Sequence, residues 1–147
     1  MYRILIVDDE KLERNGIKFL LKKTGTELEV FEASNGRDAL ELLKHQTVEI
    51  LLTDIKMPYV SGLELAEKVS SQYPEMKIVM FSGYSDFSYA QTAIRYGVSD
   101  YILKPVDPLE FQKTMKKLLE EIEREKAEEV QQIKTQDYLY QFFLQNY

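Results

Sequence analysis

The stretch ILIVDD at residues 4–9 joins an uninterrupted apolar run to two adjacent carboxylates. Two later runs have the same form: ILLT at 50–53 precedes Asp54, and YIL at 101–103 precedes Lys104. Short apolar runs without alternation are typical of strands that are buried on both faces of a parallel sheet. Because the carboxyl ends of parallel strands lie at one edge of a sheet, the sequence predicts that three carboxylates and one ammonium group meet there.

The rest of the chain predicts a regular alternation of strands and helices. In the helix expected over about 10–23, we expect the apolar residues to lie on one face: Leu12, Ile17, Leu20 and Leu21. Strands are expected at 3–7, 28–33, 49–53, 78–81 and 100–103, and the other helices at about 37–45, 63–72, 86–96 and from Pro108 onward. Right-handed crossovers between parallel strands then give a doubly wound, flavodoxin-like α/β fold with strand order 2-1-3-4-5.

Ligands of such folds bind beyond the carboxyl ends of the strands, at the point where the strand order reverses. Asp8, Asp9 and Asp54 follow the two strands that flank this point. Three close carboxylates repel one another by several kcal/mol, as an order of magnitude, unless a cation lies among them. The pattern therefore predicts a hard divalent cation, Mg²⁺, and leaves one carboxylate as a nucleophile.

The bulk composition limits the other possibilities. A chain of 147 residues corresponds to about one domain, and a net charge of −6 disfavours direct binding to nucleic acid. There is no cysteine, no apolar run long enough for a membrane span and no signal-peptide pattern. We therefore expect a cytoplasmic protein that does not bind a membrane.

The motifs together resemble the receiver domain of two-component response regulators. They are ILIVDDE at 4–10, LLTDIKMP at 51–58 with Gly62, FSGY at 81–84 and DYILKP at 100–105, and the match covers about residues 1–120. The stretch from 82 to 98 also resembles the receivers that carry an AraC-type helix-turn-helix output domain.

This resemblance implies a phosphorylation-controlled switch and not an enzyme that acts on a separate substrate. Asp54 would accept a phosphoryl group from a phosphohistidine on a sensor histidine kinase. Asp9, Asp54 and the backbone carbonyl of Lys56 would bind Mg²⁺ directly, whereas Asp8 would act largely through water.

The resemblance also implies roles for residues at the ends of the last two strands. Lys104 would pair with the carboxylate before transfer and with a phosphoryl oxygen after it, and Pro105 would follow a cis peptide bond. The hydroxyl of Ser82 would bind another phosphoryl oxygen. Tyr101 would be the aromatic residue whose rotamer follows Ser82. Lys56 and Tyr84 could control access of water to the phosphoryl group.

The C-terminal part of the chain lacks helix-breaking residues after Pro108. One helical stripe runs through it with a mean spacing near 3.6: Met115, Leu119, Ile122, Lys126, Val130, Ile133, Asp137, Tyr140 and Leu144. We expect a receiver domain at 1–120 and a helical extension at 121–147. The extension is either a solvated signalling helix or a helix that docks or dimerises. A homodimer could use this helix or the face formed by the fourth helix and fifth strand, and DNA would be bound only by an output domain that this chain lacks.

Three other functions are alternatives to a transcription-controlling switch. An aspartyl-phosphate phosphohydrolase would have DxDGT after the first strand, where this chain has DDEK at 8–11. A flavodoxin-like flavin carrier needs a Ser/Thr/Gly-rich phosphate loop at that place, whereas this loop is acidic. A stand-alone receiver that acts through protein–protein contacts stays open as an alternative to control of transcription.

Overall fold

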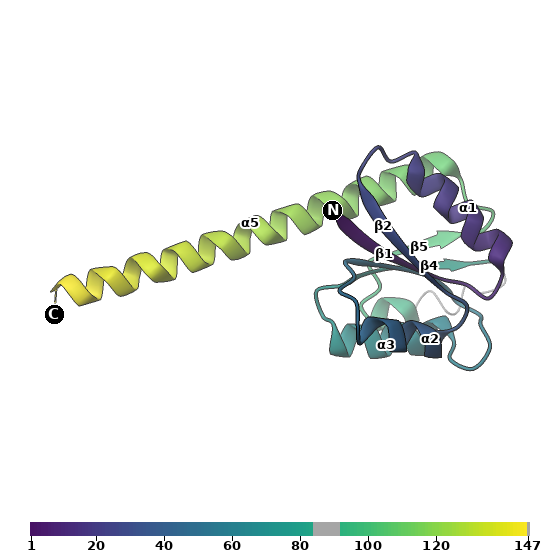
Figure 1. The fold of residues 1–147 in the computed structure, drawn as a ribbon, viewed down its shortest axis with the longest axis horizontal. Coiled ribbons are helices and arrows are strands. Elements are labelled where there is room, and N and C mark those ends of the chain that lie inside the picture. Colours follow the sequence, from purple (N-terminus) through teal and green to yellow (C-terminus); the bar gives the residue numbers. More distant parts are fainter. Residues whose placement is uncertain (84–91, 147) are drawn as a thin grey trace. The chain divides into compact units, whose positions relative to one another are not determined.

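The computed structural model describes residues 1–83 and 92–146, which form a five-stranded sheet with flanking helices (Figure 1). The strands are β1 (Tyr2–Val7), β2 (Leu28–Ala33), β3 (Ile50–Asp54), β4 (Lys77–Ser82) and β5 (Asp100–Leu103). The helices with described bounds are α1 (Lys11–Lys22), α2 (Gly36–Leu43), α3 (Gly62–Gln72) and α5 (Pro108–Asn146).

The sheet is parallel throughout and has the order β2-β1-β3-β4-β5. Val7 pairs with Ala33 on one side and with Thr53 on the other. The register then continues outward, so Asp54 lies opposite Phe81 and Ser82 lies opposite Leu103. The predicted fold class and strand order are therefore confirmed, and the residues after β1, β3 and β5 share one edge of the sheet.

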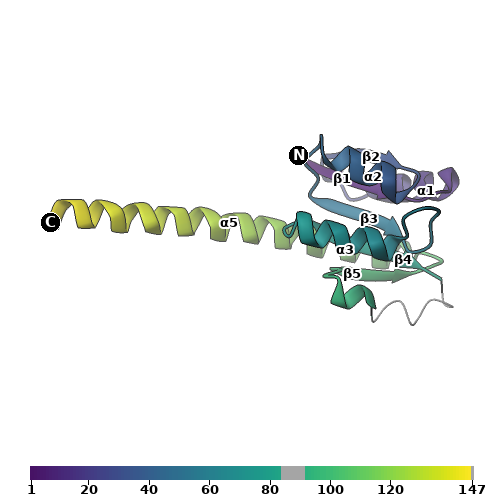
Figure 2. The same ribbon diagram turned by 90° about the horizontal axis from the view of Figure 1, so that it is seen from below.

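Helices cover both faces of this sheet (Figures 1 and 2). On one face, α2 and α3 pack on the alternate strand residues that point toward them, among them Leu5, Leu51 and Met80. On the other face, the first turns of α5 lie beside α1, where the side-chain amide of Gln112 donates a hydrogen bond of 2.8 Å to the carbonyl oxygen of Leu20. Phe111 stacks on Phe81 of β4 on that face, with 6.4 Å between the ring centroids.

The helix predicted over 10–23 forms, but one of its expected core residues is wrong. Ile17 and Leu21 are buried, whereas Leu12 is 84% exposed. Leu12 lies five residues before Ile17, which at 100° per residue places the two side chains about 140° apart around the helix. The buried stripe therefore continues from Ile17 to Leu21, one turn later, and leaves Leu12 on the solvent side.

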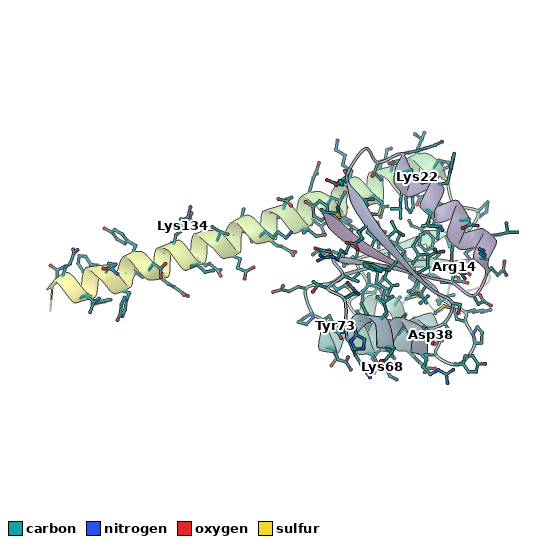
Figure 3. All side chains as sticks on the ribbon, viewed as in Figure 1. Arg14, Lys22, Asp38, Lys68, Tyr73 and Lys134 are labelled. Carbon is teal, nitrogen blue, oxygen red and sulfur yellow. The ribbon has the colours of Figure 1, made fainter. Side chains whose placement is uncertain are left out.

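The chain divides into two compact units, Met1–Thr114 and Met115–Tyr147. In the second unit Met115, Leu118, Leu119 and Ile122 are buried, and the described residues from 123 to 146 are all exposed. Side chains project outward all along this part of α5, as Lys134 does in Figure 3. No helix among the described residues is both long and apolar enough to span a bilayer.

The helix predicted over 86–96 falls partly outside the described residues. Residues 92–95 are helical, and the helix ends before Gly97, which has a φ of +75°. The earlier part of that expected helix, and Tyr84, lie outside the described residues, so the predictions for them are neither confirmed nor contradicted.

Candidate functional site

Asp8 follows β1 and is held by the backbone around it. Its side chain is only 2% exposed, and its Oδ1 accepts a hydrogen bond of 2.9 Å from the backbone N–H of Glu10. The backbone carbonyl of Asp8 accepts a bond of 2.7 Å from the guanidinium of Arg14, which is labelled on α1 in Figure 3. These contacts fix a carboxylate at the buried end of the strand.

Asp54 is the last residue of β3, and its carboxylate is 13% exposed. Oδ1 accepts a hydrogen bond of 3.0 Å from the backbone N–H of Ile55. The N–H of Gly62, at the start of α3, donates a bond of 2.8 Å to the carbonyl of Ile55. The loop between β3 and α3 therefore closes directly behind Asp54 and leaves its carboxylate on the outer side of the sheet edge.

Lys104, which follows β5, brings an ammonium group to these carboxylates. Its backbone N–H donates a bond of 2.7 Å to the carbonyl of Ser82, and its bond to Pro105 is cis, as the resemblance implies. Its Nζ lies 3.2 Å from Oδ1 of Asp54 and 3.9 Å from Oδ2 of Asp8. The structure thus brings together these three charged groups, as the sequence predicts.

Glu13 is a member of the site that sequence reasoning missed. It lies in the first turn of α1, and its Oε2 is 2.7 Å from Nζ of Lys104. Carboxylate oxygens of Asp8, Glu13 and Asp54 all lie within 4.8 Å of one another. The sequence signal that could have identified Glu13 is its position in the chain. An acidic residue in the first turn of the helix that follows β1 can reach back over the carboxyl end of that strand.

Burial and mutual repulsion shift the acid–base equilibria of this group. Burial, followed by the hydrogen bond with Glu13, raises the pKa of Asp8 to about 8. Burial also raises the pKa of Asp54, although the positive charge of Lys104 opposes this. The hydrogen bond with Asp8, followed by the contact with Lys104, lowers the pKa of Glu13. Without a cation, the site therefore favours retention of a proton.

The pKa of Lys104 is raised in spite of its partial burial. Burial by itself disfavours the ammonium form, but the hydrogen bond to Glu13 and the charge of Asp54 outweigh it. The lysine therefore stays positively charged and offsets part of the negative charge of the site.

The donor set matches a hard divalent cation, because it consists of carboxylate oxygens. Asp8 and Asp54 belong to this set, and Glu13 completes it. Asp9 is exposed and is not among the clustered carboxylates of the described residues. Lys56 lies in the exposed loop after β3, two residues from Asp54. The direct metal contacts expected of Asp9 and of the Lys56 carbonyl therefore stay predictions.

The two expected switch residues lie on β4 and β5. Ser82 is buried, and its hydroxyl donates a hydrogen bond of 3.0 Å to the carbonyl of Gly83. Tyr101 is partly buried on β5 opposite Met80. Ser82 therefore sits at the same sheet edge as Lys104, and Tyr101 lies two pairs further back along the same two strands.

A parallel sheet of this order, with carboxylates at the ends of β1 and β3 and a lysine after β5, is the arrangement that the sequence motifs lead one to expect of a receiver domain. Residues 4–116 match the model of the response regulator receiver domain family, and the chain belongs to that family.

Two curated relatives are named as transcriptional regulatory proteins. The chain is 35% identical over 127 residues to the uncharacterized transcriptional regulatory protein YesN of Bacillus subtilis, a match that covers 85% of this chain and 34% of YesN. It is 32% identical over 108 residues to the transcriptional regulatory protein HptR of Staphylococcus aureus, covering 73% of this chain and 42% of HptR. The match thus spans well under half the length of either relative.

Solved structures give the same fold. The receiver domain of AraT, a response regulator from Geobacillus stearothermophilus, is 37% identical with a TM-score of 0.77, and the match covers 85% of this chain and 98% of that one. A two-component transcriptional regulator AraC from Clostridium phytofermentans is 35% identical with a TM-score of 0.76, covering 86% and 99%. The predicted resemblance to receivers of AraC-type regulators is therefore confirmed.

Proposed function

We propose that this chain is a phosphorylation-activated switch in which Asp54 accepts a phosphoryl group from a sensor histidine kinase. The observation that carries the proposal is the 3.2 Å contact between Nζ of Lys104 and Oδ1 of Asp54, within a cluster of three carboxylates. A lysine so placed can bind the carboxylate before transfer and a phosphoryl oxygen after it.

The transfer needs few reacting groups from the protein. A carboxylate oxygen of Asp54 attacks phosphorus, the bond from phosphorus to the donor imidazole breaks, and the imidazole leaves with the electron pair of that bond. Positioning and electrostatic stabilisation supply most of the catalysis in such reactions. Lys104 offsets the charge that gathers on the phosphoryl oxygens, and the hydroxyl of Ser82 would donate to one of them.

Mg²⁺, when bound, would supply positive charge that offsets the negative charge of the carboxylates and of the transferring phosphoryl group. We propose Asp9, Asp54 and the backbone carbonyl of Lys56 as its direct ligands, with Asp8 acting through water. The clustered oxygens of Asp8 and Asp54 support a cation site at this edge of the sheet.

The switch would act on an output beyond the receiver. We propose that Ser82 and Tyr101 respond to the phosphoryl group and change the face that β5 and the fourth helix present to a second receiver. Residues 1–120 would form the receiver and 121–147 the connection to the output. The relatives' names support control of transcription. DNA would be bound by an output domain distinct from the receiver, and a kinase-coupled regulator of genes would work in the cytoplasm.

The test is phosphoryl uptake from acetyl phosphate, measured by intact mass. We expect the wild type to gain the mass of one phosphoryl group with Mg²⁺ and none in EDTA. Asp54→Asn should gain none, whereas Asp137→Asn, a control in the exposed part of α5, should behave as the wild type. Equal uptake by the wild type and Asp54→Asn, or full uptake in EDTA, would contradict the proposal.

A further inference from the structure

Glu13 makes the shortest of the three carboxylate contacts of the Lys104 ammonium group, although the resemblance gives it no role. Its Oε2 lies 2.7 Å from Nζ, compared with 3.2 Å for Asp54 and 3.9 Å for Asp8. We propose that Glu13 is a positioning residue that holds Lys104 in the unphosphorylated state and competes with the phosphoryl group for it. This inference rests on the proposed function of Asp54.

The position of Lys104 makes such competition possible. An ammonium group has three donors on one flexible stem, so its direction depends on the acceptors around it. Glu13 and Asp54 approach Nζ from different elements, α1 and β3. A hydrogen bond between charged groups is shorter and stronger than a neutral one, and the 2.7 Å contact with Glu13 is of that kind.

Phosphorylation changes the balance between the two acceptors. The carboxylate of Asp54 would be replaced by a phosphoryl group with more negative charge and three further acceptor oxygens. The phosphoryl oxygens would be stabilised by the positive charge of Lys104, whereas Glu13 adds a second negative charge close to them. Lys104 must therefore weaken its contact with Glu13 to serve the phosphoryl group, which makes phosphorylation less favourable than in a receiver without this acid.

Glu13 suits this role better than Asp8. Asp8 is buried and its Oδ1 is already bonded to the backbone N–H of Glu10. The side chain of Glu13 is 36% exposed, so it can turn toward water when Lys104 leaves it. The contact can therefore break without leaving a buried charge unpaired.

The affinity for beryllium trifluoride with Mg²⁺, a phosphoryl mimic, tests the proposal by calorimetry on the full chain. We expect Glu13→Gln to bind it about three- to tenfold more tightly than the wild type, because a partly exposed ion pair is worth about 1 kcal/mol. Glu13→Asp, which is one methylene shorter, should give most of the same gain. The control Glu10→Gln removes the same charge one turn earlier, at an exposed position, and should stay within about twofold.

The outcomes separate this inference from the proposed function. If the wild type binds no beryllium trifluoride and takes up no phosphoryl group, the proposed function fails. If the wild type binds it and Glu13→Gln binds equally or more weakly, the role of Glu13 is wrong while the function stands. An equal gain in affinity in Glu10→Gln would also overturn the role of Glu13, because the gain would then come from the loss of any nearby negative charge. Thermal melting of each variant, measured alongside, should stay close to the wild type.

Discussion

A Cβ atom at Gly62 would lie 2.1 Å from the backbone carbonyl oxygen of Asp54 and 2.8 Å from Cα of Ile55. These neighbours are main-chain atoms, so they cannot turn away as a side chain would. The close approach of α3 to the end of β3 therefore requires glycine, and it is this approach that sets the carboxylate of Asp54 at the sheet edge.

Gly62→Ala should lower the free energy of unfolding by about 2 kcal/mol or more, because the extra methyl group forces the backbone apart. Gly16→Ala is the matched control, since nothing lies within 4 Å of a Cβ at that helical position. This control should instead gain about 0.5–1 kcal/mol from helix propensity. Urea unfolding of the two variants measures both effects. Equal stability of the two would mean that the contact at Gly62 relaxes without cost.

Asp8→Asn should stabilise the protein in EDTA, and the gain should grow with pH. The pKa of Asp8 is about 8 in the fold, against an ordinary value of 3.8 for an aspartate side chain, so between these pH values the folded state holds a proton that the unfolded state has released. The stability of the wild type therefore falls as pH rises through this window. Because asparagine cannot ionise, the Asp8→Asn variant does not lose stability in this way as pH rises. Between pH 5 and pH 8 the advantage should increase by up to about 3–4 kcal/mol.

Chemical denaturation of both proteins at pH 5, 6.5 and 8 provides the check. Asp107→Asn is a suitable control, because that aspartate lies outside the carboxylate cluster. An advantage of Asp8→Asn that stays constant with pH would mean that Asp8 ionises normally in the folded protein.

Mg²⁺ should raise the melting temperature of the wild type, because it binds only the folded arrangement of carboxylates. A concentration one hundred times the Kd adds about 2.7 kcal/mol. Asp9→Ala should lose most of this response if Asp9 is a direct ligand. The structure also supplies a rival, since Glu13 lies in the carboxylate cluster and Asp9 is exposed. A full response in Asp9→Ala together with a lost response in Glu13→Gln would assign the ligand position to Glu13.

The strands could be predicted because their sequences carry a strong local signal. The apolar runs before Asp8, Asp54 and Lys104 are long enough to indicate strands buried on both faces, and strand order follows from the handedness of the crossovers. The charged residues after those runs then had to meet at the edge of the sheet formed by the carboxyl ends of the strands. This inference follows from strand direction and order alone, and the 3.2 Å contact of Lys104 with Asp54 agrees with it.

Glu13 and Leu12 could not be predicted in the same way. Both depend on the rotation of α1 about its axis, which is set by how Ile17 and Leu21 pack on the sheet. The sequence offers four apolar residues and does not say which of them face the core. Placing Leu12 on the buried face was therefore wrong. Because the rotation of α1 about its axis could not be predicted, the contact of Glu13 with Lys104 could not be predicted either.

The exposed apolar residues of α5 should mediate self-association. Val130, Ile133, Tyr140 and Leu144 lie on one stripe of the helix, and each is about half exposed or more. Water contact with so many large apolar side chains is unfavourable, so a second copy of the helix gives them a partner surface. Lys126 and Asp137 interrupt the stripe, so the association should be weak in the unphosphorylated protein.

Replacing Ile133 and Tyr140 with glutamate should therefore abolish the dimer that we expect when beryllium trifluoride and Mg²⁺ are present. The control places glutamate at Gln131 and Gln145, which lie off the stripe and add the same charge. Sedimentation velocity of the full chain, with and without the phosphoryl mimic, compares the three proteins. A dimer that persists in the Ile133→Glu, Tyr140→Glu variant would assign self-association to another face, such as that of β5. The stripe would then be left to contact an output domain, because its apolar residues would still need a partner.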